Sequence, residues 1–401
     1  MSHVIVIGAG QAGAALVARL RSGGHSGQIT LIGAEPSPPY QRPPLSKGYL
    51  MGDMGEERLW LRSNEFYADN TITLRLGTPV SAIDTAARTV TVGGDVLAYD
   101  DLALTTGATP RRLPAAIGGD LAGVYTVRTL GDVDAMRPEF APGRRLVIVG
   151  GGYIGLEAAA VAAKLGLDVT VLEMAPRILQ RVAAPETSDY FRALHTAHDV
   201  KILESTGLDR LLGDTRVTGV RLTDGRDLPA DFVIAGVGIL PGTDLAQSAG
   251  IALENGIRTD EFGQTSAPHV WAAGDCASFP WQGGRLRLES VGNAIDQAEV
   301  VADNILGAQR PYVAQPWFWS DQYECKLQIA GLNTGYDHIV TRGPEGDAVS
   351  FWYFKGDTLL AVDAMNDSRA YMVGKRLIEQ GRTVDSSAIT DPATNLKALL
   401  K

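Results

Sequence analysis

The same series of sequence patterns occurs twice in this chain. Each copy has an apolar run, a glycine-rich turn, an apolar helical segment and a second apolar run. The first copy comprises residues 4–7, 8–13, 14–20 and 28–33, and the second comprises residues 146–149, 150–155, 153–165 and 168–172. This order predicts a strand, a tight turn, a helix and a parallel strand, which is the βαβ unit of an α/β fold.

Each copy then continues through a β-rich stretch to a closing strand. The closing strands begin with an acid and end on glycine, at residues 101–107 and 231–236. Segments containing Gly and Pro follow at residues 105–114 and 235–244, and their composition is typical of crossovers between domains. The repeated order therefore indicates an internal duplication of one nucleotide-binding domain.

The predicted fold class is α/β, with two Rossmann-like dinucleotide-binding domains, one inserted in the other, and a C-terminal α+β domain. Aromatic alternating strands from Trp317 and a helix near residues 371–380 predict that last domain. The expected boundaries are 1–110 with 242–313 for the first domain, 111–241 for the inserted domain and 314–401 for the C-terminal domain.

Charge and cysteine content narrow the function class. The net charge of −10 argues against binding of nucleic acid or an anionic membrane surface. No apolar run reaches the roughly 18–20 residues of a membrane span, and no signal peptide precedes Val4. Two cysteines, Cys276 and Cys325, are too few for a disulfide scaffold or an internal iron–sulfur cluster. We therefore expect a cytoplasmic protein with no metal site.

The first glycine-rich turn has the spacing of a dinucleotide fingerprint, with Gly8, Gly10 and Gly13. The first glycine allows the turn, the second allows close approach of a pyrophosphate, and the third packs helix against strand. Glu35 follows the next strand, where a carboxylate can accept hydrogen bonds from ribose hydroxyls.

The second turn repeats this device with Gly150, Gly152 and Gly155, and Glu173 ends its second strand. An acid at that position favours the free 2′-hydroxyl of NADH and repels the 2′-phosphate of NADPH. Two such sites imply two dinucleotides, one bound lastingly and one transiently.

Beyond these turns, the chain resembles the FAD-dependent ferredoxin reductases of putidaredoxin-reductase type, within the glutathione-reductase-like superfamily. The resemblance runs through essentially the full length. It is carried by residues 40–47 (YQRPPLSK), 150–157 (GGGYIGLE), 271–276 (WAAGDC), 289–294 (ESVGNA) and 317–323 (WFWSDQY).

This resemblance implies roles for individual residues. Lys47 corresponds to the lysine beside the flavin N5 edge, and Glu157 to the acid that pairs with it near the nicotinamide. Asp275 corresponds to the ribityl-binding aspartate, Val291 to a backbone N–H at the flavin pyrimidine, and Trp319 to an aromatic beside the flavin. The remaining cofactor-binding candidates are Ala12, Arg42, Val80, Arg128, Ile154 and Gly236. Many relatives carry an acid at the position of Ala34, so here Glu35 must serve the ribose alone or from a slightly shifted register.

The absence of a cysteine before Cys276 excludes a redox thiol in the loop after Glu35. Cys276 itself is expected to be a small buried residue. A flavin reduced by NADH must then pass its electrons outward. The expected acceptor is a separate two-iron, two-sulfur ferredoxin that serves a haem monooxygenase or a ring-hydroxylating dioxygenase. Candidate basic residues for its docking are Arg285, Arg287, Arg310, Lys326, Lys375 and Arg376.

Two alternatives share these motifs. A rubredoxin-type carrier reductase would differ only in its partner, and an NADH-sensing flavoprotein like apoptosis-inducing factor would hold a long-lived charge-transfer complex. His195 and His198 have a spacing that a metal could use, but with no third ligand evident we interpret them as surface-helix residues.

Overall fold

The computed structural model describes residues 2–343, 348–391 and 393–401, which form two compact units. Unit 1 comprises Met1–Gln41, Gly55–Thr109 and Ile239–Pro316. Unit 2 comprises Arg42–Met54, Pro110–Gly238 and Trp317–Lys401. The short segment around Lys47 therefore belongs to unit 2, although its neighbours in sequence belong to unit 1.

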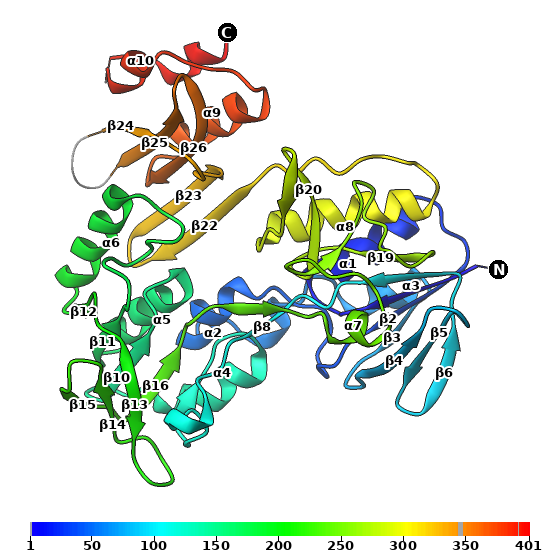
Figure 1. Ribbon diagram of the computed structural model, residues 1–401, viewed down its shortest axis with the longest axis horizontal. Helices are drawn as coiled ribbons and strands as arrows, with labels where there is room; N and C mark the ends of the chain where they lie inside the picture. Colours follow the sequence, from blue (N-terminus) through cyan, green and yellow to red (C-terminus); the bar gives the residue numbers. More distant parts are fainter. Residues whose placement is uncertain (1, 344–347, 392) are drawn as a thin grey trace. The chain divides into compact units, whose positions relative to one another are not determined.

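A five-stranded parallel sheet forms the centre of unit 1. Its strands, in sheet order, are β19 (Val270–Ala272), β7 (Asp101–Leu104), β1 (His3–Ile7), β2 (Gln28–Ile32) and β3 (Ile72–Arg75). Successive residues of β1 enter different cores, because strand side chains alternate between faces. Val4 and Val6 pack with helices α1 (Gln11–Ser22) and α8 (Val291–Ile305), which lie side by side in Figure 1. Ile5 and Ile7 pack on the opposite face.

That opposite face is covered by an antiparallel three-stranded sheet and a short helix. The sheet consists of β4 (Val80–Asp84), β5 (Thr89–Val92) and β6 (Asp95–Ala98), and the helix is α7 (Asp244–Ser248). Val90 and Val92 from β5 are fully buried against the central strands. Both faces of the parallel sheet are thus covered, as its uniformly apolar strands require.

Unit 2 contains a second parallel sheet with the same strand arrangement. Its order is β12 (Lys201–Leu203), β11 (Asp168–Leu172), β10 (Arg145–Val149), β16 (Phe232–Ala235) and β9 (Val124–Tyr125). Strand β10 lies between β11 and β16, as β1 lies between β2 and β7. Helix α5 (Tyr153–Lys164) follows β10, and a hairpin sheet of β13 (Leu208–Leu212), β14 (Gly219–Leu222) and β15 (Asp227–Pro229) precedes β16. The internal duplication predicted from the sequence is therefore confirmed.

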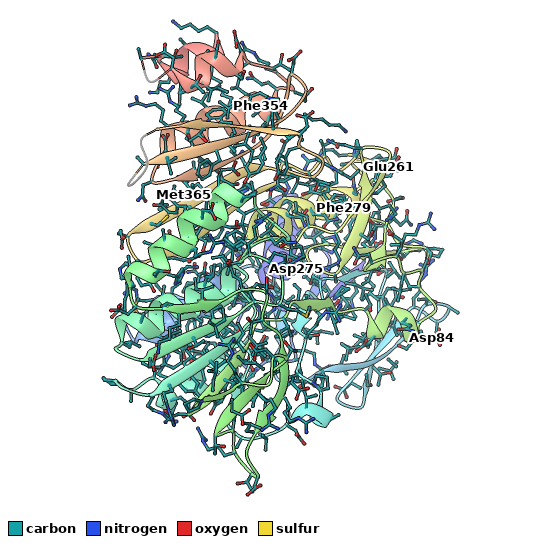
Figure 2. The ribbon with its side chains drawn as sticks, turned by 60° about the vertical axis from the view of Figure 1, so that its left-hand side comes forward. Asp84, Glu261, Asp275, Phe279, Phe354 and Met365 are labelled. Atoms are coloured by element: carbon teal, nitrogen blue, oxygen red, sulfur yellow. The ribbon has the colours of Figure 1, made fainter. Side chains whose placement is uncertain are left out.

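The C-terminal part of unit 2 is an antiparallel five-stranded sheet. Its order is β22 (Trp317–Gln322), β23 (Cys325–Gly331), β26 (Thr358–Met365), β25 (Val349–Lys355) and β24 (His338–Arg342). One face packs on helix α9 (Ser368–Glu379) and includes Phe354, and the other includes Met365 and packs on helix α6 (Pro185–Ala197). Figure 2 labels both residues on this sheet. The mixed fold class predicted from the sequence is confirmed.

The other elements are short. They are η1 (Pro43–Ser46), α2 (Gly48–Met51), η2 (Glu56–Arg58), α3 (Asn64–Asp69), β8 (Ala108–Pro110), η3 (Ala115–Ile117), α4 (Leu130–Met136), η4 (Arg137–Glu139), β17 (Ile239–Pro241), β18 (Ile257–Arg258), β20 (Ala277–Trp281), β21 (Gly284–Leu286), α10 (Ser386–Thr390) and η5 (Leu396–Leu400). Strands β8 and β17 lie within the two segments that the sequence predicted to be crossovers, and they pair with each other. Among the described residues, no helix is long and apolar enough to span a membrane.

Candidate functional site

The first glycine-rich turn joins β1 to α1 in unit 1. Gly8 has a φ of +116°, and a Cβ there would lie 2.1 Å from the carbonyl oxygen of Thr105. A Cβ on Gly13 would lie 2.1 Å from the Gly8 carbonyl oxygen, so the helix packs closely on the turn. A Cβ on Gly10, by contrast, would meet no atom within 4 Å. This open space lies at a helix N-terminus that lacks a side-chain cap, and it fits a dinucleotide pyrophosphate.

The second turn, between β10 and α5 in unit 2, has the same geometry. Gly150 has a φ of +110°, and its Cβ would lie 2.4 Å from the carbonyl oxygen of Gly236 at the end of β16. A Cβ on Gly155 would lie 2.4 Å from the Gly150 carbonyl oxygen. Gly152 again faces open space and caps its helix without a side-chain hydrogen bond. Unit 2 therefore contains a second turn whose open space fits a dinucleotide pyrophosphate.

An acidic side chain follows the second strand of each βαβ unit. Glu35 accepts a 2.5 Å hydrogen bond from the Tyr40 hydroxyl. Glu173 accepts hydrogen bonds from the backbone N–H groups of Gly151, at 2.8 Å, and Ala175, at 2.7 Å. The Glu173 carboxylate thus lies against the second glycine-rich turn. A carboxylate has about four lone-pair sites, so these two donors leave capacity for ribose hydroxyls.

The centre of the candidate active site in unit 2 is an ion pair between Lys47 and Glu157. Lys47 Nζ lies 2.8 Å from Glu157 Oε1, and the two side chains are 18% and 6% exposed. Lys47 Nζ also donates to the Pro43 carbonyl oxygen at 3.4 Å. Because an ammonium group has three N–H donors, Lys47 can donate one further hydrogen bond, which fits the flavin acceptor edge that the resemblance implies.

Two serines complete the surroundings of the Glu157 carboxylate. Ser46 Oγ donates to Oε2 at 2.7 Å, and Ser320 Oγ donates to Oε1 at 2.7 Å. The carboxylate therefore receives hydrogen bonds at both oxygens in addition to the Lys47 charge. A buried carboxylate needs such partners, because removal from water disfavours its charged form. The sequence prediction missed these roles, although both serines lie within the motif stretches that carry the resemblance.

Three chain segments bring this cluster together. Lys47 and Ser46 come from the turn between η1 and α2, and Glu157 comes from the second turn of α5. Tyr153 lies one helical turn before Glu157, on the same face of α5. Strand β22 faces these two residues with Phe318, whose ring centroid lies 5.0 Å from that of Tyr153, and with Ser320.

In unit 1, Asp275 and Val291 lie in segments suited to cofactor contacts. Asp275, labelled in Figure 2, follows β19, and its carbonyl oxygen accepts from Arg287 Nη1 at 3.1 Å. Val291 is the first residue of α8, after the N-cap Ser290, whose Oγ accepts from the Asn293 N–H at 3.1 Å. First-turn N–H groups lack intrahelical partners, so the Val291 N–H can meet a ligand acceptor.

The remaining candidates are divided between the units. In unit 1, Val80 begins β4, and Ala12 is buried in the first turn of α1. In unit 2, Arg42 Nη1 donates to the Arg128 carbonyl oxygen at 2.5 Å, which ties two of the candidates together. Ile154 is 45% exposed at the start of α5, beside Gly152.

Trp319 lies on the opposite face of β22 from Ser320. Its ring stacks on Trp317 with centroids 5.5 Å apart and an interplanar angle of 21°. Both rings line a pocket of about 240 Å³ with Phe318, Lys326, Gln328 and Tyr371. Strand β22 therefore contacts Glu157 from one face and presents an aromatic pocket on the other.

Among the six basic docking candidates, four are engaged by carboxylates. Arg285 pairs with Glu254, Arg287 with Glu289, Arg310 with Asp303, and Lys375 with Glu379. Within the described part of the chain, Lys326 and Arg376 make no ion pair. Of these two, Lys326 lines the aromatic pocket.

The interpretation of His195 as a surface residue is wrong. Its side chain is completely buried, and Nε2 lies 2.7 Å from Gln322 Oε1. The hydrophobic pattern of α6 alone could not reveal this, because the covering strand, β22, lies far along the sequence. Cys276 is buried as expected, and burial raises the pKa of its thiol, which disfavours the reactive thiolate.

Comparison with known proteins supports one family throughout the chain. The family model described as "Pyridine nucleotide-disulphide oxidoreductase" matches residues 2–298, and "Reductase C-terminal" matches residues 317–400. A ferredoxin–NAD(P)+ reductase of Sphingomonas sp is 44% identical over 98% of this chain and 96% of its own length. A biphenyl dioxygenase system ferredoxin–NAD+ reductase component of Paraburkholderia xenovorans is 38% identical, with 99% and 98% covered.

A solved structure agrees with these sequence matches. The crystal structure of a covalent putidaredoxin reductase–putidaredoxin complex contains a chain that is 40% identical to this one. It superposes with a TM-score of 0.96 and covers 100% of this chain and 98% of its own.

Proposed function

Because this chain belongs to the pyridine nucleotide-disulphide oxidoreductase family, we propose that it is an FAD-dependent NADH:ferredoxin reductase. It takes hydride from NADH onto FAD and passes single electrons to a separate two-iron, two-sulfur ferredoxin. That ferredoxin serves a monooxygenase or dioxygenase. The observation that carries the proposal is the Lys47–Glu157 pair beside a complete second dinucleotide turn.

The two turns have different occupants in this proposal. Residues 1–110 with 242–313 bind FAD through the first turn, Glu35, Asp275 and Val291. Residues 111–241 bind NADH through the second turn and Glu173, and residues 314–401 form the partner-facing domain. FAD, when bound, accepts two electrons as hydride and releases them singly, so one NADH reduces two ferredoxins.

The side chains around Glu157 position the reactants, and none of them acts as a nucleophile. When FAD is bound, the Lys47 ammonium would donate to the flavin N5 edge, and its positive charge would favour the electron-rich reduced ring. Glu157 holds that ammonium in place and borders the nicotinamide position. Thiol chemistry has no part in this site, because both cysteines are buried and burial raises the pKa of each thiol.

Electrons leave through the C-terminal part of unit 2 in this proposal. Trp319 and Trp317 line the partner-facing pocket, and Lys326 supplies a positive charge there. We also propose a cytoplasmic location, which two unpaired cysteines support.

The test uses the purified full-length protein. It should contain one FAD, and anaerobic stopped-flow mixing should show the flavin absorbance bleached much faster by NADH than by NADPH. Reoxidation should be fast with a two-iron, two-sulfur ferredoxin and slow with rubredoxin. A protein that cannot be loaded with FAD would contradict the assignment. Fast reoxidation by rubredoxin alone would indicate the carrier reductase, and a long-lived charge-transfer band would indicate an NADH sensor.

A further inference from the structure

A chain of buried polar groups connects Glu157 to His195 on helix α6. Ser320 Oγ donates to Glu157 Oε1 at 2.7 Å, and Gln322 Nε2 donates to Ser320 Oγ at 3.0 Å. His195 Nε2 lies 2.7 Å from Gln322 Oε1. Ser320, Gln322 and His195 are each at most 1% exposed. Burying polar side chains of this kind costs free energy unless they are hydrogen-bonded, and these three satisfy one another in a continuous chain.

The direction of every hydrogen bond in this chain is determined. An amide oxygen can only accept, so His195 must carry its proton on Nε2 and donate to Gln322. Gln322 then donates to the Ser320 oxygen, and the single hydroxyl proton of Ser320 is left for Glu157. On the other side of the ring, the Tyr323 hydroxyl lies 3.3 Å from His195 Nδ1 and can donate to it. All donors therefore point toward one carboxylate oxygen.

The environment of His195 keeps the ring in the required form. Burial is the main cause that lowers the pKa of His195 to about 4, with a smaller contribution from the nearby His198, while the hydrogen bond to Gln322 acts in the opposite direction. The ring is therefore neutral around pH 7, with Nε2 protonated by the geometry above and Nδ1 available as an acceptor. A neutral imidazole with one donor and one acceptor is the form that the chain requires.

We propose that His195, acting through Gln322 and Ser320, is a positioning residue that orients the Glu157 carboxylate toward Lys47. This inference rests on the proposed function, since the value of the orientation is that it fixes Lys47 at the flavin edge. Glu157 Oε1 accepts from both Lys47 and Ser320, so the direction of the serine hydroxyl determines where the ammonium can lie. Without Gln322, the hydroxyl can rotate to another acceptor.

A positioning role for His195 can be distinguished from a purely structural role by the chemical group that each role requires at this position. A structural residue needs the right volume, whereas a positioning residue needs a donor at the Nε2 location. His195→Phe keeps a ring and removes the donor. His195→Gln places an amide N–H near the same point and should restore the chain. Phe191→Leu, one helical turn before His195 and fully buried, removes apolar volume without removing a hydrogen-bonding group and is the matched control.

The experiment compares these three variants as FAD-loaded protein. His195→Phe should slow flavin reduction by saturating NADH by up to about tenfold, which is the size expected for the loss of one buried hydrogen bond, here the one between His195 and Gln322. The apparent Kd for NADH should change by less than about twofold, because the chain does not contact the nucleotide turn. His195→Gln should recover most of the rate, and Phe191→Leu should lower only the melting temperature.

Crystal structures of wild type and His195→Phe provide a readout that does not depend on turnover. In the variant, Glu157 should rotate and its distance from Lys47 Nζ should increase. An unchanged rate and geometry in His195→Phe, or equal losses in His195→Gln or Phe191→Leu, would overturn the proposal. A wild-type protein that NADH fails to reduce would instead contradict the proposed function, and the crystal structures would still decide the positioning role.

Discussion

At the scale of single residues, Glu157 and Glu173 have the same side chain but different surroundings. Glu157 is buried and receives one ammonium and two hydroxyl donors. Glu173 is partly exposed and receives two backbone N–H donors from the glycine-rich turn and the segment after β11. The first environment satisfies the carboxylate entirely within the protein, whereas the second leaves lone pairs available to a ligand.

Glu173→Arg should change the nucleotide preference, because it removes a ribose acceptor and adds a partner for a 2′-phosphate. We expect the ratio of kcat/KM for NADH over NADPH to fall by about tenfold or more, ~1.4 kcal/mol per decade. Glu173→Gln keeps one oxygen for the backbone donors and serves as the control for turn stability. A lower melting temperature with an unchanged ratio would mean that Glu173 only stabilises the turn.

At the scale of elements, the two glycine-rich turns assign a separate task to each glycine. The third glycine of each turn packs the helix onto the turn, and the second faces open space. These tasks differ physically. The third glycine is required by a close contact within the protein, whereas the second glycine leaves room for a ligand.

Two alanine substitutions in the second turn should separate these tasks. Gly155→Ala places a Cβ 2.4 Å from the Gly150 carbonyl oxygen and should destabilise the fold by about 1–3 kcal/mol. Gly152→Ala should leave the melting temperature near that of wild type and weaken NADH binding, measured by titration of the oxidised enzyme with NAD+. Gly131→Ala, where a Cβ would lie 3.9 Å from the Thr129 hydroxyl oxygen, is the control. Equal effects of Gly152→Ala and Gly155→Ala on stability would contradict this division.

The sequence predicted most of the elements, because turn chemistry and apolar runs are local signals. The second helix was expected to begin at Tyr153 and does so. Helix α9 begins at Ser368, earlier than the expected start near residue 371, because the Asp367 side chain caps it by accepting from the Ala370 N–H. The burial of His195 and the roles of Ser320 and Gln322 depend on β22 lying against α5 and α6. Such long-range contacts leave no periodic signal in a single sequence.

At the scale of the whole molecule, the net charge of −10 sets a condition for association with an acidic partner. A local positive charge is needed where the partner approaches, because like charges slow diffusional encounter. Lys326 meets this condition best among the described basic candidates, since it lines the aromatic pocket and forms no ion pair there.

Lys326→Glu should slow ferredoxin reduction about tenfold at low ionic strength and weaken its salt dependence. Flavin reduction by NADH should be unchanged, because in the proposed function Lys326 belongs to the docking surface and not to the residues that bind NADH or position the reactants. Arg226→Glu reverses an exposed charge on the β14–β15 hairpin and should affect neither half-reaction. Stopped-flow measurement of the two half-reactions decides the outcome. Equal losses in both for Lys326→Glu would indicate a folding defect, and no loss in either would place docking elsewhere.

The alternation of side chains along β22 has a consequence for how such a reductase can be re-engineered or diverge. Trp317 and Trp319 can be exchanged for other residues to suit a new carrier while Ser320 and Gln322 remain untouched on the opposite face. An insertion or deletion of one residue would instead turn both faces over at once. If the proposed function holds, partner choice can therefore change by substitution on one face of β22, whereas the length of the strand cannot change without disturbing the contacts of Ser320 with Glu157 on the other face.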